Sequence, residues 1–70
     1  MRCCILFGED FEEIEAVTQI DILRRGGVEI DIYGVGSLEL KGKMGILLKT
    51  EKLFVKDNDI DINKYEGIIL

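Results

Sequence analysis

The chain has 70 residues, of which 47% are hydrophobic, and its charged residues are spread along the sequence. This composition favours one small folded domain over intrinsic disorder. The net charge of -5 repels nucleic acid phosphates and anionic lipid surfaces alike. No apolar run approaches the roughly 20 residues of a membrane-spanning helix, and the N-terminus lacks the pattern of a secretory signal, so we expect a cytoplasmic protein that binds neither nucleic acid nor membrane.

The cysteine and histidine content narrows the chemistry further. Cys3 and Cys4 are the only cysteines, and the chain has no histidine. Because neighbours in a strand point to opposite faces, we predict two buried structural thiols rather than a disulfide or a metal site. The missing histidine removes the commonest general base and metal ligand. We therefore predict no metal, no cofactor and no Cys-His or Ser-His pair within this chain.

The first two predicted elements are a strand and a helix. Met1–Phe7 is a continuous apolar run, which is typical of a strand covered on both faces, as in parallel sheets. The pattern that follows predicts a helix over Phe11–Arg25. Asp10 is its expected N-cap, with Glu13 completing a capping box. Gly26–Gly27 supply the left-handed stop at the other end.

A second strand is predicted over Val28–Tyr33, where apolar and polar residues alternate. The alternation indicates a half-buried strand, and Gly34 and Gly36 are expected to end it. Strand, helix and strand together form a right-handed parallel βαβ unit.

The remaining residues predict a hairpin and a final strand. Leu38–Lys41 and Ile46–Lys49 flank a glycine-containing turn, as in a short hairpin appended to the sheet. The next 17 or so residues are polar and irregular, with one helical turn expected near Leu53–Val55. Gly67–Leu70 then begins another buried parallel strand. A parallel sheet needs helices on both faces, and this chain supplies one. We expect an N-terminal piece of a longer protein, or half of a split pair, whose sheet is completed by the remainder of the domain or by a second chain.

Acidic residues gather in the stretch Asp10–Glu15, directly after the first strand. Open α/β sheets keep their chemistry at this end of their strands. On a helical wheel Glu15 lies between Phe11 and Ile22, whereas Glu12 is expected to be a solvated neighbour. Two interpretations of Glu15 stay open. It is either an exposed acid favoured by the helix dipole, or a carboxyl group in apolar surroundings that keeps its proton and donates a hydrogen bond.

Two familiar binding motifs are excluded by spacing. Asp57–Asp61 opens like a calcium loop, but Ile62 stands where the loop needs glycine and Ile68 stands where it needs glutamate. The glycines do not form a G-x-G-x-x-G fingerprint after the first strand, so a dinucleotide site has no support.

Four blocks of the sequence resemble the ThiJ/PfpI superfamily: Phe11–Val17, Ile20–Ile30, Gly45–Ile46 and Asn63–Leu70. The resemblance covers the chain and rests chiefly on the first block. It implies a flavodoxin-like (class I glutamine amidotransferase-like) α/β fold, a three-layer sandwich with a mainly parallel sheet. Residues 1–70 would be the N-terminal β-α-β-β-β-β part of a single domain of this kind.

The resemblance also implies a role for Glu15. In that superfamily the matching glutamate hydrogen-bonds the sulfur of a reactive cysteine on a strand-to-helix elbow, which would lie beyond residue 70. Neither Cys3 nor Cys4 matches that nucleophile. The implied activity is that of a glyoxalase or deglycase acting on reactive carbonyls or glycated adducts, or of a cysteine hydrolase, and the older label of thiazole monophosphate biosynthesis belongs to the same superfamily.

A homodimer formed through the first helix is a further implication of the resemblance. The expected interface residues are Ile14, Val17, Asp21 and Arg25, on a second stripe of the helix opposite Ala16. The alternative is that this stripe packs under another helix of the same domain.

Two rival functions are kept: a non-catalytic stress or chaperone interaction module, and a phosphoacceptor receiver-like domain in which Glu9–Asp10 holds magnesium.

Overall fold

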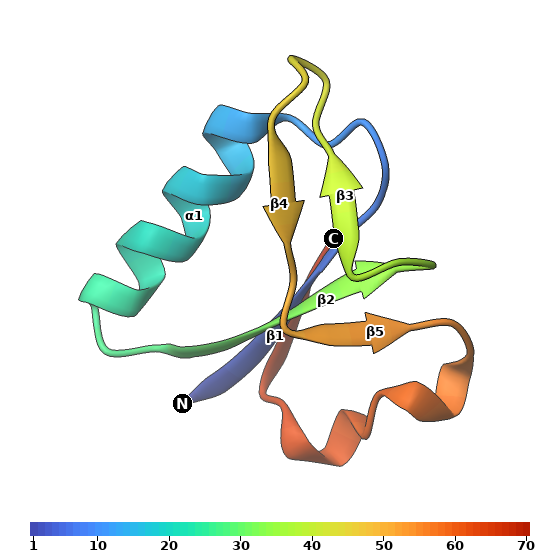
Figure 1. The fold of residues 1–70 in the computed structure, drawn as a ribbon. Helices are drawn as coiled ribbons and strands as arrows, with labels where there is room; N and C mark the ends of the chain where they lie inside the picture. Colours follow the sequence, from blue (N-terminus) through green and yellow to red (C-terminus); the bar gives the residue numbers. More distant parts are fainter.

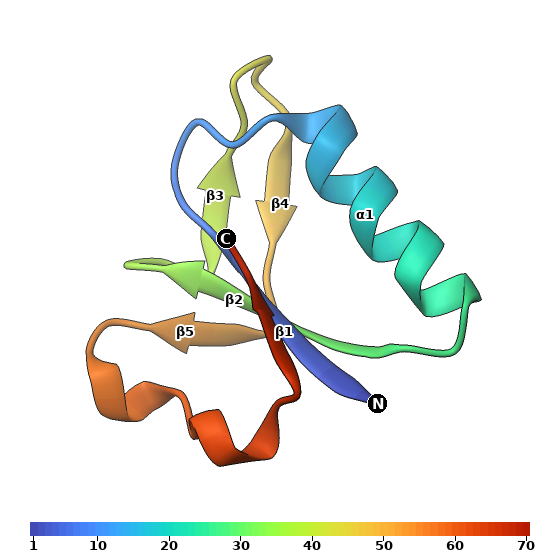
Figure 2. The same ribbon diagram turned by 180° about the vertical axis from the view of Figure 1, so that it is seen from behind.

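The computed structural model describes residues 1–70 as one helix packed on a parallel sheet, with a separate hairpin beside it (Figures 1 and 2). In chain order the elements are β1 (Arg2–Phe7), α1 (Glu13–Arg25), β2 (Glu29–Val35), β3 (Glu39–Lys41), β4 (Leu47–Lys49), β5 (Lys52–Phe54), η1 (Asp57–Asp59), η2 (Ile62–Lys64) and β6 (Gly67–Ile69). The main sheet has the order β5-β2-β1-β6 with every pair parallel, and β3 and β4 form an antiparallel sheet of their own. The α/β class is confirmed. No helix is both long and apolar enough to cross a membrane.

β1 is one of the two inner strands of the sheet and is apolar on both of its faces. It pairs with β2 on one side and with β6 on the other. Cys3, Ile5 and Phe7 belong to the core cluster under α1, whereas Cys4 belongs to a second cluster on the opposite face. The continuous apolar run therefore produces the predicted strand with two buried faces.

The main core lies between α1 and the sheet. Ala16 and Ile20 are the apolar residues that α1 buries, and they pack with Ile5 and with Leu40 of the hairpin. Ile5 and Leu40 are only 1% and 2% exposed, so each contributes roughly 1.5–3 kcal/mol of hydrophobic stabilisation. Leu40 also ties the separate hairpin to the core of the domain.

The predicted start of the helix was wrong. α1 begins at Glu13 rather than Phe11, and its N-cap is Glu12, whose carboxylate accepts a hydrogen bond from Ile14 N at 2.7 Å. Asp10 lies two residues earlier with a φ of 65°, and Glu13 is buried instead of forming a capping box. The hairpin holds these residues by backbone hydrogen bonds, and that contact overrides the local capping preference.

The predicted end of the helix is confirmed. Gly27 takes a φ of 90°, the left-handed conformation that only glycine adopts without strain. In the last turn of the helix Arg25 Nε donates to Asp21 Oδ1 at 3.0 Å and forms an i,i+4 ion pair.

β2 is buried on both faces, so the prediction of a half-buried strand was wrong. Its alternating polar residue Asp31 is 9% exposed and lies among charged and phenolic partners rather than in water. Gly34 does not end the strand; it pairs with Phe7 inside it. The strand continues to Val35, since β5 pairs with its last residues.

The segment after the hairpin also differs from the prediction. Lys52–Phe54 forms β5, a parallel edge strand next to β2, where a helical turn was expected near Leu53–Val55. Gly67–Ile69 forms β6 and pairs in parallel with β1 as predicted, but the predicted burial was wrong, because Ile68 is 48% exposed on the sheet face that carries no helix. The described part of the fold is thus β-α-β-β-β-β-β, one strand longer than the predicted order, because three residues carry too short a pattern to identify an edge strand.

The sheet face opposite α1 carries no helix in residues 1–70. It is covered in part by the loop that contains η1 and η2, which Figure 2 shows below the sheet.

A polar network surrounds Asp31 on this face. Tyr65 donates a hydrogen bond to Asp31 Oδ2 at 2.5 Å, Tyr33 and Tyr65 share a hydrogen bond of 2.8 Å, and Arg2 donates to Asp31 Oδ1 at 2.9 Å. Lys52 Nζ lies 3.8 Å from Asp31. We call these five residues the Asp31 network; it joins β1, β2 and β5 to Tyr65, which lies between η2 and β6.

Candidate functional site

The candidate site lies at the carboxyl ends of β1 and β6. The chain passes from β1 to β2 on one side of β1, and β6 pairs with β1 on the other side. The strand order therefore reverses between β1 and β6. In open α/β sheets such a reversal leaves a crevice outside the carboxyl ends of the strands, and ligands bind there.

A cavity of about 230 Å³ occupies this position. Gly8 borders it at the end of β1, Leu70 borders it at the end of β6, and Glu15 and Gln19 border it from α1. Phe11, which stacks on Phe7 with ring centroids 5.5 Å apart, forms an apolar wall. The structure thus brings Glu15 to the reversal point of the sheet.

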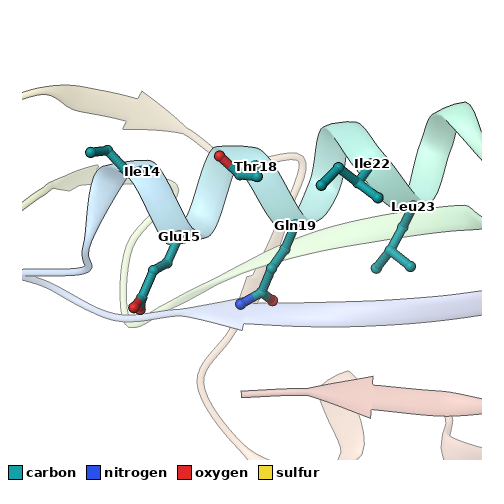
Figure 3. A pocket seen from close by; sticks show the side chains of 6 residues that line it. All are labelled: Ile14, Glu15, Thr18, Gln19, Ile22 and Leu23. Atoms are coloured by element: carbon teal, nitrogen blue, oxygen red, sulfur yellow. The ribbon is translucent and has the colours of Figure 1, made fainter.

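Glu15 points from α1 toward the end of β1 and is exposed in this chain (Figure 3). Gln19, one helical turn on, points the same way, so the two polar groups form a pair at the mouth of the cavity. A surface groove of about 590 Å³ continues along α1 past Thr18 to Ile22. Residues 1–70 do not supply the apolar enclosure that the second interpretation of Glu15 requires, so its catalytic role stays a prediction.

The acidic residues that precede α1 do not gather around a metal. Glu9 Oε1 accepts a hydrogen bond from Lys41 N at 3.0 Å, and Asp10 N donates to the Lys41 carbonyl at 2.9 Å. The Glu9 carboxylate is therefore engaged by the hairpin rather than paired with Asp10 as in a receiver-type site. No group of three or more potential ligands in the chain is arranged to hold a metal ion.

The two thiols are buried and unpaired, as predicted. Burial, with a further contribution from the charge of Asp31, raises the pKa of the Cys4 thiol. A thiol with a raised pKa carries little thiolate at neutral pH and is a poor nucleophile. Cys4 is accordingly a packing residue of the second core.

The predicted interface residues lie together on the exposed side of α1. Ile14 and Val17 are 74% and 52% exposed, and Asp21 and Arg25 continue the same stripe as an exposed ion pair. Met44, 79% exposed, lies beside Ile14 at a pocket between the hairpin and the helix. No partner chain is present, so the interface itself stays a prediction.

Sequence reasoning missed two residues of this region. Gln19 stands four residues after Glu15, and that spacing alone could have placed it on the same face. Glu13 was interpreted as a capping residue, yet it is 7% exposed and hydrogen-bonded to the hairpin turn 31 residues away. No local pattern signals such a distant contact.

The sheet topology defines a flavodoxin-like α/β protein, with a cavity at the carboxyl ends of the central strands. A comparison with protein families matches residues 1–70 to the DJ-1/PfpI family. The chain therefore belongs to the DJ-1/PfpI family, which is the superfamily that the sequence resembles. The receiver-like alternative is excluded by this membership. No curated protein matches the chain.

Three solved structures share the fold. The VC2308 protein has a TM-score of 0.71 and 30% identity over 74% of this chain and 27% of its own. Oxidized DJ-1 of Toxoplasma gondii has a TM-score of 0.71 and 34% identity over 74% of this chain and 29% of its own. A cysteine-to-alanine mutant of a DJ-1 superfamily protein from Salmonella typhimurium has a TM-score of 0.71, at 24% identity over 74% of this chain and 29% of its own. The chain thus spans less than a third of the length of each.

Proposed function

We propose that this chain contributes Glu15 to a cysteine-dependent site that acts on small reactive carbonyls or their glycated adducts, as a glyoxalase or deglycase. The observation that carries the proposal is the position of Glu15 beside Gly8 and Leu70, at the reversal point between β1 and β6. Because β6 ends at the border of this cavity, a residue placed directly after β6 would lie beside it. A cysteine hydrolase, which cleaves its substrate with a cysteine nucleophile, uses the same arrangement of a nucleophile and a nearby acid and is the second proposed activity.

The proposed chemistry assigns Glu15 a supporting part. The reactive cysteine lies outside residues 1–70 and attacks the carbonyl carbon as a thiolate. A protonated Glu15 donates a hydrogen bond to that thiolate, and so lowers the pKa of the cysteine. DJ-1 of Toxoplasma gondii, which is 34% identical to this chain, was solved in an oxidized form, and this supports an oxidizable group in the family's site. The two buried, unpaired thiols of this chain support a reducing compartment, and we propose the cytoplasm.

Substitution of Glu15 by alanine tests this role in the intact protein. Because the donor to the thiolate is lost, we expect the pKa of the reactive cysteine to rise by about one unit, equivalent to about 1.4 kcal/mol. Iodoacetamide alkylation measured from pH 4 to pH 9 reports that pKa directly. Glu39→Ala, which removes an exposed carboxylate on β3, is the matched control and should leave the profile unchanged. An unchanged profile for Glu15→Ala would refute the role and favour the non-catalytic interaction module.

We also propose that the protein is a homodimer formed through the exposed stripe of α1. Val17 lies on that stripe, so Val17→Glu would bury an unpaired charge at the interface, at a cost of about 2–5 kcal/mol. Light scattering coupled to gel filtration is expected to show a monomer at micromolar concentration. Val55→Glu places the same charge at a 64% exposed position remote from α1 and should remain dimeric. A dimer that survives Val17→Glu would place the interface elsewhere.

A further inference from the structure

The hairpin turn, residues 42–46, contacts the start of α1 through the side chain of Glu13. Glu13 Oε2 accepts hydrogen bonds from Met44 N at 2.8 Å and from Ile46 N at 3.3 Å. A single carboxylate oxygen therefore satisfies two backbone donors of the turn. Glu13 and Asp31 are the two buried carboxylates of the chain, and Glu13 is the one that lies in the helix bearing Glu15.

The backbone of the turn is shaped to receive this carboxylate. At Gly42 a Cβ atom would lie 2.8 Å from Glu13 Cγ and closer still to the carboxyl group, so no larger residue fits without moving it. Gly45 takes a φ of 90° and closes the turn by donating to the Gly42 carbonyl at 3.0 Å. Burial alone would raise the pKa of Glu13, but its bonds from backbone N–H groups and the charge of Lys43 outweigh burial and hold that pKa below its usual range. Glu13 is charged at neutral pH, which strengthens both bonds to the turn.

The same hairpin also holds the loop between β1 and α1. Lys41 N donates to Glu9 Oε1, Asp10 N donates to the Lys41 carbonyl, and Lys43 N donates to the Phe11 carbonyl at 2.8 Å. With the two bonds to Glu13, five hydrogen bonds cross from the hairpin to residues 9–13. This loop carries the chain directly into the turn of α1 that bears Glu15, and α1 begins only at Glu13.

We propose that Glu13 is a positioning residue, which fixes Glu15 at the carboxyl end of β1 by fastening the hairpin turn to the first turn of α1. The inference rests on the proposed function, because it gives Glu13 a part in the same cysteine site. Glu13 acts through Glu15 and does not touch the substrate. The contact of its carboxyl group with the hairpin determines where α1 starts. Glu15 is two residues later in the same turn, so its position depends on that start.

Three variants of the intact protein test the proposal: Glu13→Ala, Glu13→Gln and the exposed control Glu39→Ala. Glu13→Ala removes the acceptor of both amides, so hydrogen exchange at Met44 and Ile46 is expected to accelerate about tenfold. The pH profile of cysteine alkylation should then shift in the direction of the Glu15→Ala profile. Glu13→Gln keeps the oxygen that both amides use but loses the charge that strengthens the bonds, so exchange should accelerate less than in Glu13→Ala and alkylation should stay within about threefold of the wild-type values. The control should change neither.

Gly42→Ala provides an independent variant that removes no charged group. Its new methyl group displaces the Glu13 carboxylate, so it should reproduce both effects of Glu13→Ala even if that variant fails to fold. Faster amide exchange with a wild-type alkylation profile, in either variant, would overturn the positioning role and leave Glu13 a structural residue. If Glu15→Ala also has a wild-type profile, the proposed function itself is refuted. A shift for Glu15→Ala without one for Glu13→Ala or Gly42→Ala refutes only the present inference.

Discussion

Replacing Asp31 with alanine is expected to lower the free energy of unfolding by about 3 kcal/mol, because the substitution removes the buried carboxylate at the centre of the Asp31 network. Arg2 and Tyr65 both donate to this carboxylate, at 2.9 and 2.5 Å, and without it the Arg2 guanidinium would keep only its bond to Glu29 and Tyr65 only its bond to Tyr33. Urea unfolding of wild type and variant at pH 7 measures the difference. Tyr65→Phe and the double variant complete a cycle, and a coupling near zero between the two sites would contradict the network.

The Asp31 network also makes stability depend on pH. Burial alone would raise the pKa of Asp31, but hydrogen bonds from Tyr65 and Arg2 and the charge of Lys52 outweigh it and hold the pKa below its usual range. The folded pKa thus lies below the unfolded value of about 3.9, so Asp31 stabilises the fold above that pH. The contribution is lost as the pH falls through the folded pKa. The stability gap between wild type and Asp31→Ala should therefore narrow from pH 5 downward; a constant gap would assign the loss to packing alone.

The second large effect is expected at Gly34. A Cβ atom there would clash with the Ser37 carbonyl oxygen and lie 2.6 Å from Thr50 Oγ1. A backbone carbonyl cannot move away from the clash as a flexible side chain can. We therefore expect Gly34→Ala to lower the free energy of unfolding by about 3 kcal/mol, the upper end of the usual cost of overpacking. Thermal unfolding followed by circular dichroism measures the loss.

Gly8→Ala is the matched control for this substitution. No atom lies within 4 Å of a Cβ built at Gly8, and its φ is not in the left-handed region. Alanine there restricts the unfolded chain and should stabilise the protein by about 0.4–1 kcal/mol. Similar losses in both glycine variants would show that the close approach of residues 37 and 50 to Gly34 is not the cause.

The long apolar and amphipathic segments were predictable from the sequence. β1, most of α1 and the hairpin each span several residues with a clear period or a strong glycine stop, and local preference and tertiary packing agree in them. β2 was located by its alternating pattern, although packing buries both of its faces. β5 was missed because its three residues owe their conformation to pairing with Tyr33–Val35. An edge strand of that length carries no pattern of its own.

The errors at polar residues have a common physical cause. Asp31 fits the solvent side of an alternating strand, and Glu13 fits a helix cap, so each has an adequate local explanation. In the structure both carboxylates are buried by partners more than 28 residues away, Tyr65 in one case and Met44 in the other. Partners at such distances are brought together by the topology of the fold, which no local sequence pattern encodes. Glu15, in contrast, was located correctly at the end of β1, because its place depends only on the strand and helix that flank it.

The central place of β1 has a consequence for the order in which the molecule is assembled. Its hydrogen-bonding partners lie far along the chain: Arg2 bonds Glu29, 27 residues away, and Glu66, 64 residues away. Contacts between such distant residues require the closure of long loops, which makes folding slow. The pairing of β1 is therefore completed only after the residues of β6 have been synthesised, and until then one edge of β1 is open to aggregation or to chaperones.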